Sequence, residues 1–138
     1  MTSEEYAALY QAVLKDNDMK APQAALFGEL TSRLVAANAV MNLTAIRDPA
    51  EMMALHYADC LRVAPWIPTG AKVMDVGTGA GFPALPLAVI RPDLRIVALD
   101  STAKKLRFVK ETAEALGLMN LRTLTARAEK VGREVNDR

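Results

Sequence analysis

The feature that most constrains the fold is a run of alternating glycines that follows a short apolar segment and an acid. The run reads VMDVGTGAGFP over residues 73–83. Because glycine lacks a Cβ, the backbone there can turn tightly, adopt positive φ and let a ligand approach the main chain. A helix that begins directly afterwards presents unpaired N–H groups to that ligand. The segment therefore predicts a strand, a bare loop and a helix that bind an anion or a nucleotide.

The spacing of the glycines separates two classes of cofactor. The dinucleotide fingerprint is G-x-G-x-x-G/A, but Phe82 occupies the third position here, where a bulky ring would hold the helix off the strand. An acid two residues before G-x-G-x-G is the pattern typical of S-adenosylmethionine sites, and Asp75 with the three glycines fits it. We therefore expect S-adenosylmethionine as cofactor. The alternative is that the glycines only form a tight turn between a strand and a helix.

Composition narrows the kinds of partner that the chain can have. Its 138 residues suit one domain with a core, because 51% of them are hydrophobic and 24% are charged. The formal net charge of +1 excludes a global field that would draw the protein to nucleic acid or anionic lipid, so such contacts must be local. The longest apolar run, residues 84–90, is interrupted by Pro86 and is too short to span a membrane.

The single cysteine, Cys60, excludes an internal disulfide and a zinc site built on several thiolates. We expect no metal site, a small buried side chain at this position, and a protein of the reducing cytoplasm. Glu4 and Glu5 stand where a signal peptide would have its basic region, so no such peptide is expected.

The first part of the chain, residues 1–70, predicts three helices. A capping box, T-x-x-E, at residues 2–5 begins the first helix, and Pro22 opens the second, in which Gly28 is a weak helix former. The segment DPAE at residues 48–51 combines a capping acid, a proline at the first helical position and a glutamate in the first turn of the third helix. We therefore expect an N-terminal helical region before the first strand.

His56 and Asp59 are three positions apart and so lie on one face of the third expected helix. A histidine beside a carboxylate can act as a base with its orienting group, but no serine or cysteine nucleophile with its own signature accompanies this pair. The interpretation we favour is structural: a partly buried His56, bonded to the neighbouring carboxylate, fixes the helix against the next region. The preceding segment, residues 42–47, mixes polar and apolar side chains. It is expected either to be a loop anchored to the rest of the protein or to take part in binding.

Residues 71–138 alternate strands and helices, as a parallel α/β domain does. The expected strands are residues 72–76, 95–99 and 121–126, and the expected helices include residues 84–90 and 106–116, with Gly117 as a stop. The first strand is almost wholly apolar, which is typical of a strand covered on both faces.

Asp100 closes the second expected strand. A carboxylate at this place can hold a ribose diol by two charge-assisted hydrogen bonds, whichever of the two cofactor classes binds. The alternative is a helix N-cap ahead of Thr102. The next helix opens with four cations, Lys104, Lys105, Arg107 and Lys110. Such a run is usually a solvated face, although here it adjoins the ligand end of the sheet.

Several short motifs share one order along nearly the whole chain. They are Asn38, MNLTAIRDP at residues 41–49 with Glu51 and Met52, H-x-x-D at 56–59, DVGTGAGFP at 75–83, RPDL at 91–94, LDS at 99–101 with Lys104 and Arg107, and RAE at 127–129. In this combination the chain resembles the RsmG (formerly GidB) family, bacterial methyltransferases that modify N7 of one guanine in 16S ribosomal RNA. Cys60 stands where that family usually has serine, and Ala37 where it often has tryptophan.

The resemblance implies a class I, Rossmann-like α/β methyltransferase fold with an N-terminal helical extension (residues 1–70, then 71–138). It also implies S-adenosylmethionine as cofactor and 16S ribosomal RNA or the small ribosomal subunit as partner, with no membrane. It places Gly77 and Phe82 at the methionine end of the cofactor, Asp100 at the ribose, and Ala128 with Glu129 around the adenine. The candidate cofactor-binding residues are Asp75, Gly77, Thr78, Gly79, Gly81, Phe82, Asp100, Ser101, Ala128 and Glu129. No catalytic residue is assigned, because guanine N7 already offers a lone pair.

The family continues beyond position 138 through a fourth strand, so the resemblance implies an incomplete sheet. In the family's strand order, 3-2-1-4-5, that fourth strand lies beside residues 72–76. We expect this first strand to be an apolar edge that either pairs with a second copy or is covered by the N-terminal helices. We also expect the 138 residues alone to bind the cofactor weakly and to have no methyltransferase activity. The alternatives are a methyltransferase for protein or a small molecule, and a non-catalytic truncated cofactor-binding or assembly module; a dehydrogenase is least favoured.

Overall fold

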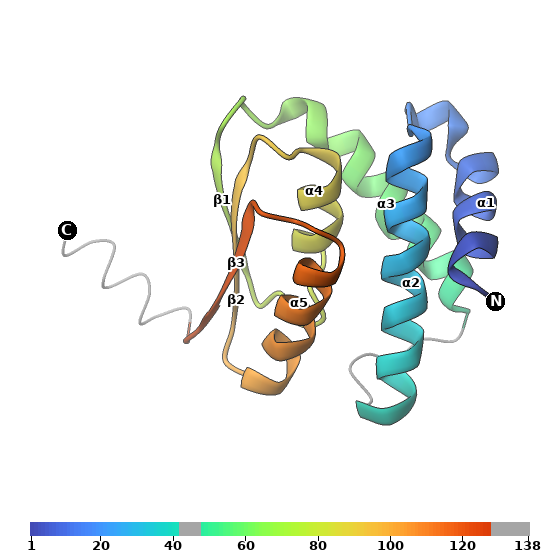
Figure 1. Ribbon diagram of the computed structural model, residues 1–138. Coiled ribbons are helices and arrows are strands. Elements are labelled where there is room, and N and C mark those ends of the chain that lie inside the picture. Colours follow the sequence, from blue (N-terminus) through green and yellow to red (C-terminus); the bar gives the residue numbers. More distant parts are fainter. Residues whose placement is uncertain (42–47, 128–138) are drawn as a thin grey trace.

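The computed structural model describes residues 1–41 and 48–127, and its helices and strands alternate from Lys72 onward (Figure 1). The N-terminal helices are α1 (Ser3–Val13), α2 (Ala21–Met41) and α3 (Pro49–Val63), with short 3-10 turns at Lys15–Asn17 and Ala64–Trp66. The remaining elements are β1 (Lys72–Val76), α4 (Ala84–Ile90), β2 (Arg95–Asp100), α5 (Ala103–Ala115) and β3 (Leu121–Thr125). These bounds agree with the predicted ones to within a few residues.

The three strands form a parallel sheet in the order β1-β2-β3. Val73 lies beside Ile96, and Ile96 lies beside Leu121. In Figure 1, α4 and α5 lie against one face of this sheet, and α1, α2 and α3 lie beyond them, on the side away from the strands. One face of the sheet is therefore covered by two layers of helix, whereas no helix of the described residues covers the other.

This one-sided arrangement determines the exposure of β1. Side chains alternate between the two faces of a strand, and Met74 and Val76, which share a face, are 38% and 54% exposed. In the described part of the chain β1 pairs with β2 alone. The predicted apolar edge is therefore confirmed, whereas coverage on both faces is not observed. The alternative in which the N-terminal helices cover the edge is wrong, because those helices pack on the far side of α4 and α5 (Figure 1).

The helix starts follow the local signals in the sequence. The Thr2 hydroxyl accepts the Glu5 N–H at 3.1 Å, and the Glu5 carboxylate accepts the Thr2 N–H at 3.0 Å, so the predicted capping box is formed. Asp48 caps α3 by accepting the Glu51 N–H at 3.3 Å. The segment 42–47, predicted to anchor or to bind, lies outside the described residues. Within those described, no helix has both the length and the apolar character needed to cross a membrane.

A buried network of hydroxyl groups joins the three N-terminal helices. Thr31, on α2, shares hydrogen bonds with the phenol of Tyr10 at 3.0 Å and with that of Tyr57 at 2.8 Å. The Tyr57 ring also stacks on Phe27, with centroids 4.1 Å apart, and its hydroxyl donates to the Phe27 carbonyl at 3.2 Å. Burial raises the pKa of Tyr10 to about 12 and raises that of Tyr57 well above its usual value. These phenols therefore stay protonated, and α1 and α3 are held to α2.

Arg91 joins the end of the helical region to the sheet region. Its guanidinium donates to the carbonyls of Ala64 at 2.6 Å and Ile67 at 2.9 Å, and it pairs with Asp93 at 2.7 Å. The Asp93 carboxylate also accepts the Gly70 N–H at 2.9 Å. The hydrogen bonds from Arg91 and Gly70 hold the pKa of Asp93 well below its usual range. In the sequence this arginine was one residue of the RPDL motif and followed the expected helix over residues 84–90.

Candidate cofactor site

The loop between β1 and α4 is fixed to the neighbouring strand by its own main chain. The N–H groups of Gly77 and Thr78 both donate to the Leu99 carbonyl, at 2.8 and 2.9 Å. A further hydrogen bond from Gly81 N–H to the Thr78 carbonyl, at 3.0 Å, closes the turn. The predicted strand, loop and helix are therefore confirmed, and the loop lies at the carboxyl ends of β1 and β2.

The glycines of the loop have two different structural roles. At Gly79, where φ is +58°, a Cβ would find no atom within 4 Å, so the space beside the main chain is open. At Gly81, where φ is +96°, a Cβ would come within 2.5 Å of Leu85 Cδ1 and 3.1 Å of Val109 Cγ2. Gly79 therefore allows a ligand to approach the backbone, whereas Gly81 allows α4 and α5 to pack closely.

Asp75 holds the loop to the start of α4. One oxygen of its half-buried carboxylate accepts the Thr78 hydroxyl at 2.6 Å and the Ala84 N–H at 3.1 Å. Burial raises the pKa of Asp75, although both hydrogen bonds oppose that shift. Thr78 is itself buried. These two candidate residues therefore hold the loop in place through hydrogen bonds within it and to the start of α4.

Asp100 lies opposite the loop, at the end of β2. One carboxylate oxygen accepts the Gly79 N–H at 2.9 Å, and the other accepts the Thr102 N–H at 2.9 Å. Burial acts to raise the pKa of Asp100, but these hydrogen bonds outweigh it and the pKa lies below its usual value. A carboxylate oxygen can accept two hydrogen bonds, so the group fits a ribose diol while it orders the loop. The alternative, in which Asp100 is the N-cap of the next helix, is wrong: Thr102 is the N-cap residue of α5, and Asp100 accepts the N–H of that residue.

Phe82 connects the loop to α3. Its half-buried ring lies 5.5 Å from the His56 ring, at an angle of 43°, and a cis peptide joins it to Pro83. The prediction of a partly buried His56 bonded to Asp59 is wrong: His56 is exposed, and Asp59 pairs with Arg62 at 3.2 Å. Asp59 is three positions from each of them, and the guanidinium, which is always charged, is the partner that it takes.

Three candidate cofactor-binding residues remain, at exposed or undescribed positions. Ser101 lies on the exposed turn between β2 and α5, whereas Ala128 and Glu129 lie outside the described residues.

Cys60 is buried as predicted, and burial raises the pKa of its thiol to about 12. Among the described residues, no three His, Cys, Asp or Glu side chains gather as a metal site would need.

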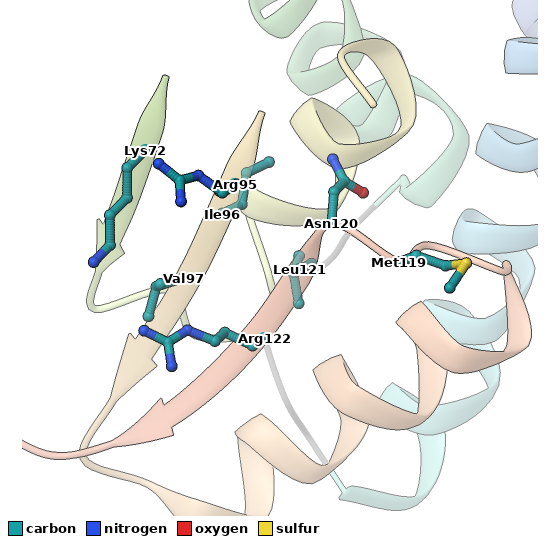
Figure 2. A pocket seen from close by; sticks show the side chains of 8 residues that line it. All are labelled: Lys72, Arg95, Ile96, Val97, Met119, Asn120, Leu121 and Arg122. Carbon is teal, nitrogen blue, oxygen red and sulfur yellow. The ribbon is translucent and has the colours of Figure 1, made fainter. Parts of the chain in front are cut away.

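A separate hollow of about 280 Å³ lies at the opposite end of the strands (Figure 2). Lys72 and Arg95 begin β1 and β2 there, and Arg122 lies on β3. Figure 2 shows these three cations on the face that the helices leave uncovered. Neither the glycine loop nor Asp100 lines this hollow, so it is distinct from the site that the sequence predicted.

Comparison with known proteins shows the family to which this chain is similar. Residues 23–137 match the family model GidB, described as rRNA small subunit methyltransferase G. The chain is 39% identical to a ribosomal RNA small subunit methyltransferase G from Trichormus variabilis, over 97% of this chain and 57% of that protein. It is 42% identical to one from Deinococcus radiodurans, over 86% of this chain and 47% of that protein. The chain thus spans about half the length of the curated relatives it matches.

A solved structure supports the fold. Coclaurine N-methyltransferase bound to N-methylheliamine and SAH superposes with a TM-score of 0.52 at 20% identity, over 91% of this chain and 44% of that one. With its parallel sheet and flanking helices, the chain has the predicted class I methyltransferase fold. The family match and the identities to the two bacterial proteins are more specific than this likeness of fold. The chain belongs to the rRNA small subunit methyltransferase G (GidB) family.

Proposed function

We propose that this chain is the N-terminal part of an enzyme that transfers a methyl group from S-adenosylmethionine to N7 of a guanine in 16S ribosomal RNA. The observation that carries the proposal is the meeting of the open glycine loop and the Asp100 carboxylate at the carboxyl ends of β1 and β2. Open α/β sheets bind their ligands at this end. Because the chain spans about half of its relatives, the activity is proposed for a protein of their length.

The proposed cofactor-binding residues follow from these positions. Gly77 and Gly79 leave the main chain open to close approach, and Asp100 accepts hydrogen bonds from a ribose diol. Phe82 belongs to the same loop. We propose that Gly77 and Phe82 lie at the methionine end, and that Ala128 and Glu129 surround the adenine. The full proposed set is Asp75, Gly77, Thr78, Gly79, Gly81, Phe82, Asp100, Ser101, Ala128 and Glu129.

Methyl transfer to N7 depends on the placement of the reacting atoms and not on the transfer of a proton. When bound, S-adenosylmethionine supplies an electrophilic methyl group on a sulfonium, and guanine N7 has a free lone pair on its major-groove edge. No residue of this chain is therefore needed as a base. The chain must hold the loop fixed and orient the ribose of the cofactor, because alignment of the reacting atoms alone strongly lowers the activation barrier. The hydrogen bond between Gly79 N–H and Asp100 supplies that rigidity.

Replacing Asp100 with alanine tests the ribose assignment. We expect S-adenosylhomocysteine to bind about 10- to 150-fold more weakly, which corresponds to about 1.5–3 kcal/mol for a hydrogen bond to a charged group. Titration calorimetry with S-adenosylhomocysteine and with its analogue lacking the ribose hydroxyls measures the effect. The unsubstituted chain should discriminate between the two ligands, whereas Asp100→Ala should bind both equally. If Asp100→Ala still discriminates, the ribose lies elsewhere and Asp100 only orders the loop.

We also propose how the chain is divided into regions, which partner it has and in which compartment it acts. Residues 1–70 form a helical region, supported by the shared hydroxyl network of α1, α2 and α3. Residues 71–138 form the first half of the methyltransferase domain, supported by the parallel pairing of the three strands. The proposed partner, 16S ribosomal RNA in the small ribosomal subunit, implies a cytoplasmic protein with no membrane role.

Self-association through β1 is a further expectation for the chain as it stands. The free edge carries the exposed apolar side chains Met74 and Val76, and unpaired strand edges pair readily. Light scattering after size-exclusion chromatography should show dimers whose fraction rises with concentration. A Met74→Lys/Val76→Lys chain should be monomeric, while Leu55→Lys, which changes a 63% exposed residue on α3, should leave the dimer intact. A monomer at every concentration would rule out pairing at this edge.

A further inference from the structure

Three cations form a stripe along one side of α5. Lys104, Arg107 and Lys110, here called the basic stripe, are spaced three residues apart and are all exposed. Six residues of α-helix span about 9 Å, so the stripe extends over nearly two turns. Glu111 and Glu114 follow Arg107 and Lys110 by four residues, yet within the described ranges no carboxylate pairs with any of the three cations. The stripe therefore presents its charge to solvent.

The position of the stripe is unfavourable for the helix itself. The first turn of a helix carries a partial positive charge and favours acidic side chains. The first turn of α5 has no acid and contains Lys104 and Lys105. Asp100 supplies negative charge just ahead of it, and Lys105 is one of the groups that lower the pKa of that carboxyl. Helix stability alone would not select these cations, and an anion bound at this place would offset their mutual repulsion.

The stripe borders a groove beside the candidate cofactor site. The groove has a volume of about 370 Å³ and is lined by Met41 from the end of α2 and by Lys104, Arg107, Phe108 and Glu111 from α5. In Figure 1 the last turn of α2 and the first turn of α5 lie at the same end of the molecule, where β2 runs into α5. That end also holds Asp100 and the glycine loop. A polyanion lying along the groove would therefore lie at the same end of the molecule as the candidate cofactor site.

We propose that the basic stripe and this groove bind the phosphate backbone of the RNA substrate beside the target nucleotide. The inference rests on the proposed function, since it takes RNA as the polyanion. With a net charge of +1 these 138 residues have no general attraction for RNA, so any attraction that they exert must come from a local stripe. Phe108 is only 6% exposed and cannot stack on a base. The contact is therefore with phosphates, which position the RNA and leave the choice of base to other groups.

A salt titration with a matched control tests this surface. Binding of a fluorescein-labelled single-stranded 16S ribosomal RNA fragment is followed by fluorescence anisotropy for the unsubstituted chain and for two double variants. Lys104→Gln/Arg107→Gln removes two cations from the groove, and Lys72→Gln/Arg95→Gln removes two from the uncovered face of the sheet. We expect the groove variant to bind about tenfold more weakly, and the slope of log K against log salt to fall by about 1.4, since each phosphate contact contributes about 0.7. The sheet variant should keep the affinity and slope of the unsubstituted chain.

Three outcomes would overturn the proposal: equal losses in both variants, no loss in the groove variant, or tighter binding of polyglutamate than of RNA. Thermal melting establishes that each variant is folded. Calorimetry with S-adenosylmethionine on the same samples separates this surface from the proposed function, because the groove variant should bind the cofactor as the unsubstituted chain does. RNA binding that depends on the stripe in a chain with no affinity for S-adenosylmethionine would support the surface and count against the methyltransferase proposal.

Discussion

A Gly79→Val chain is expected to lose S-adenosylmethionine binding almost completely while it keeps its helices. At φ +58° a non-glycine residue costs about 1–2 kcal/mol, and a branched side chain is a strong outlier there. Relaxation of the loop would also break the hydrogen bond from Gly79 N–H to Asp100. A hydrogen bond to a charged group is worth about 1.5–3 kcal/mol. Added to the backbone cost, its loss corresponds to a decrease in affinity of roughly a hundredfold or more. Calorimetry with the cofactor and circular dichroism measure the two quantities.

Gly117→Val is the matched control for this substitution. Gly117, at φ +70°, also has no atom within 4 Å of a Cβ, and it follows α5 at the end away from the glycine loop. The backbone strain should therefore be similar, so the two variants should lose similar stability while only Gly79→Val loses the cofactor. Near-normal affinity in Gly79→Val would mean that the loop is only a tight turn and that the proposed site is misplaced.

Gly28→Val is expected to lower the free energy of unfolding by about 3 kcal/mol, at the upper end of the range for overpacking a close contact. Gly28 lies where α1 crosses α2: a Cβ would lie 2.8 Å from Ala7 N and 2.9 Å from Ala7 Cβ, and it would clash with the Ser3 carbonyl. Main-chain atoms of a neighbouring helix cannot move aside as a flexible side chain can, so the helices must separate. Urea unfolding followed by circular dichroism measures the change.

The control for this variant is Ala25→Val, which places the same side chain on an exposed position of the same helix. Its cost should be limited to the difference in helix propensity, below about 0.7 kcal/mol. Equal unfolding free energies for Gly28→Val and Ala25→Val would mean that α1 and α2 do not approach as closely as described.

The sequence alone determined the elements and the loop because these depend on neighbours along the chain. Caps at Thr2 and Asp48 fixed helix starts, since a side chain there bonds N–H groups only three residues away. The alternating glycines after Asp75 predicted the strand, loop and helix for the same local reason. The placement of Asp100 opposite the loop followed from parallel strands, whose carboxyl ends share one edge of the sheet. The family resemblance rested on the same local motifs.

Only the tertiary structure decided which long-range partner each residue takes. Gly28 indicated a weak helix position, whereas the structure makes it the contact point of two helices. Asp59 had two possible partners at equal spacing and takes Arg62, which leaves His56 on the Phe82 ring. Arg91 joins carbonyls more than twenty residues away in sequence, and β1 has one uncovered face although its composition suits two covered ones. Burial and partner choice depend on what packs against a residue, and spacing along the chain does not encode that.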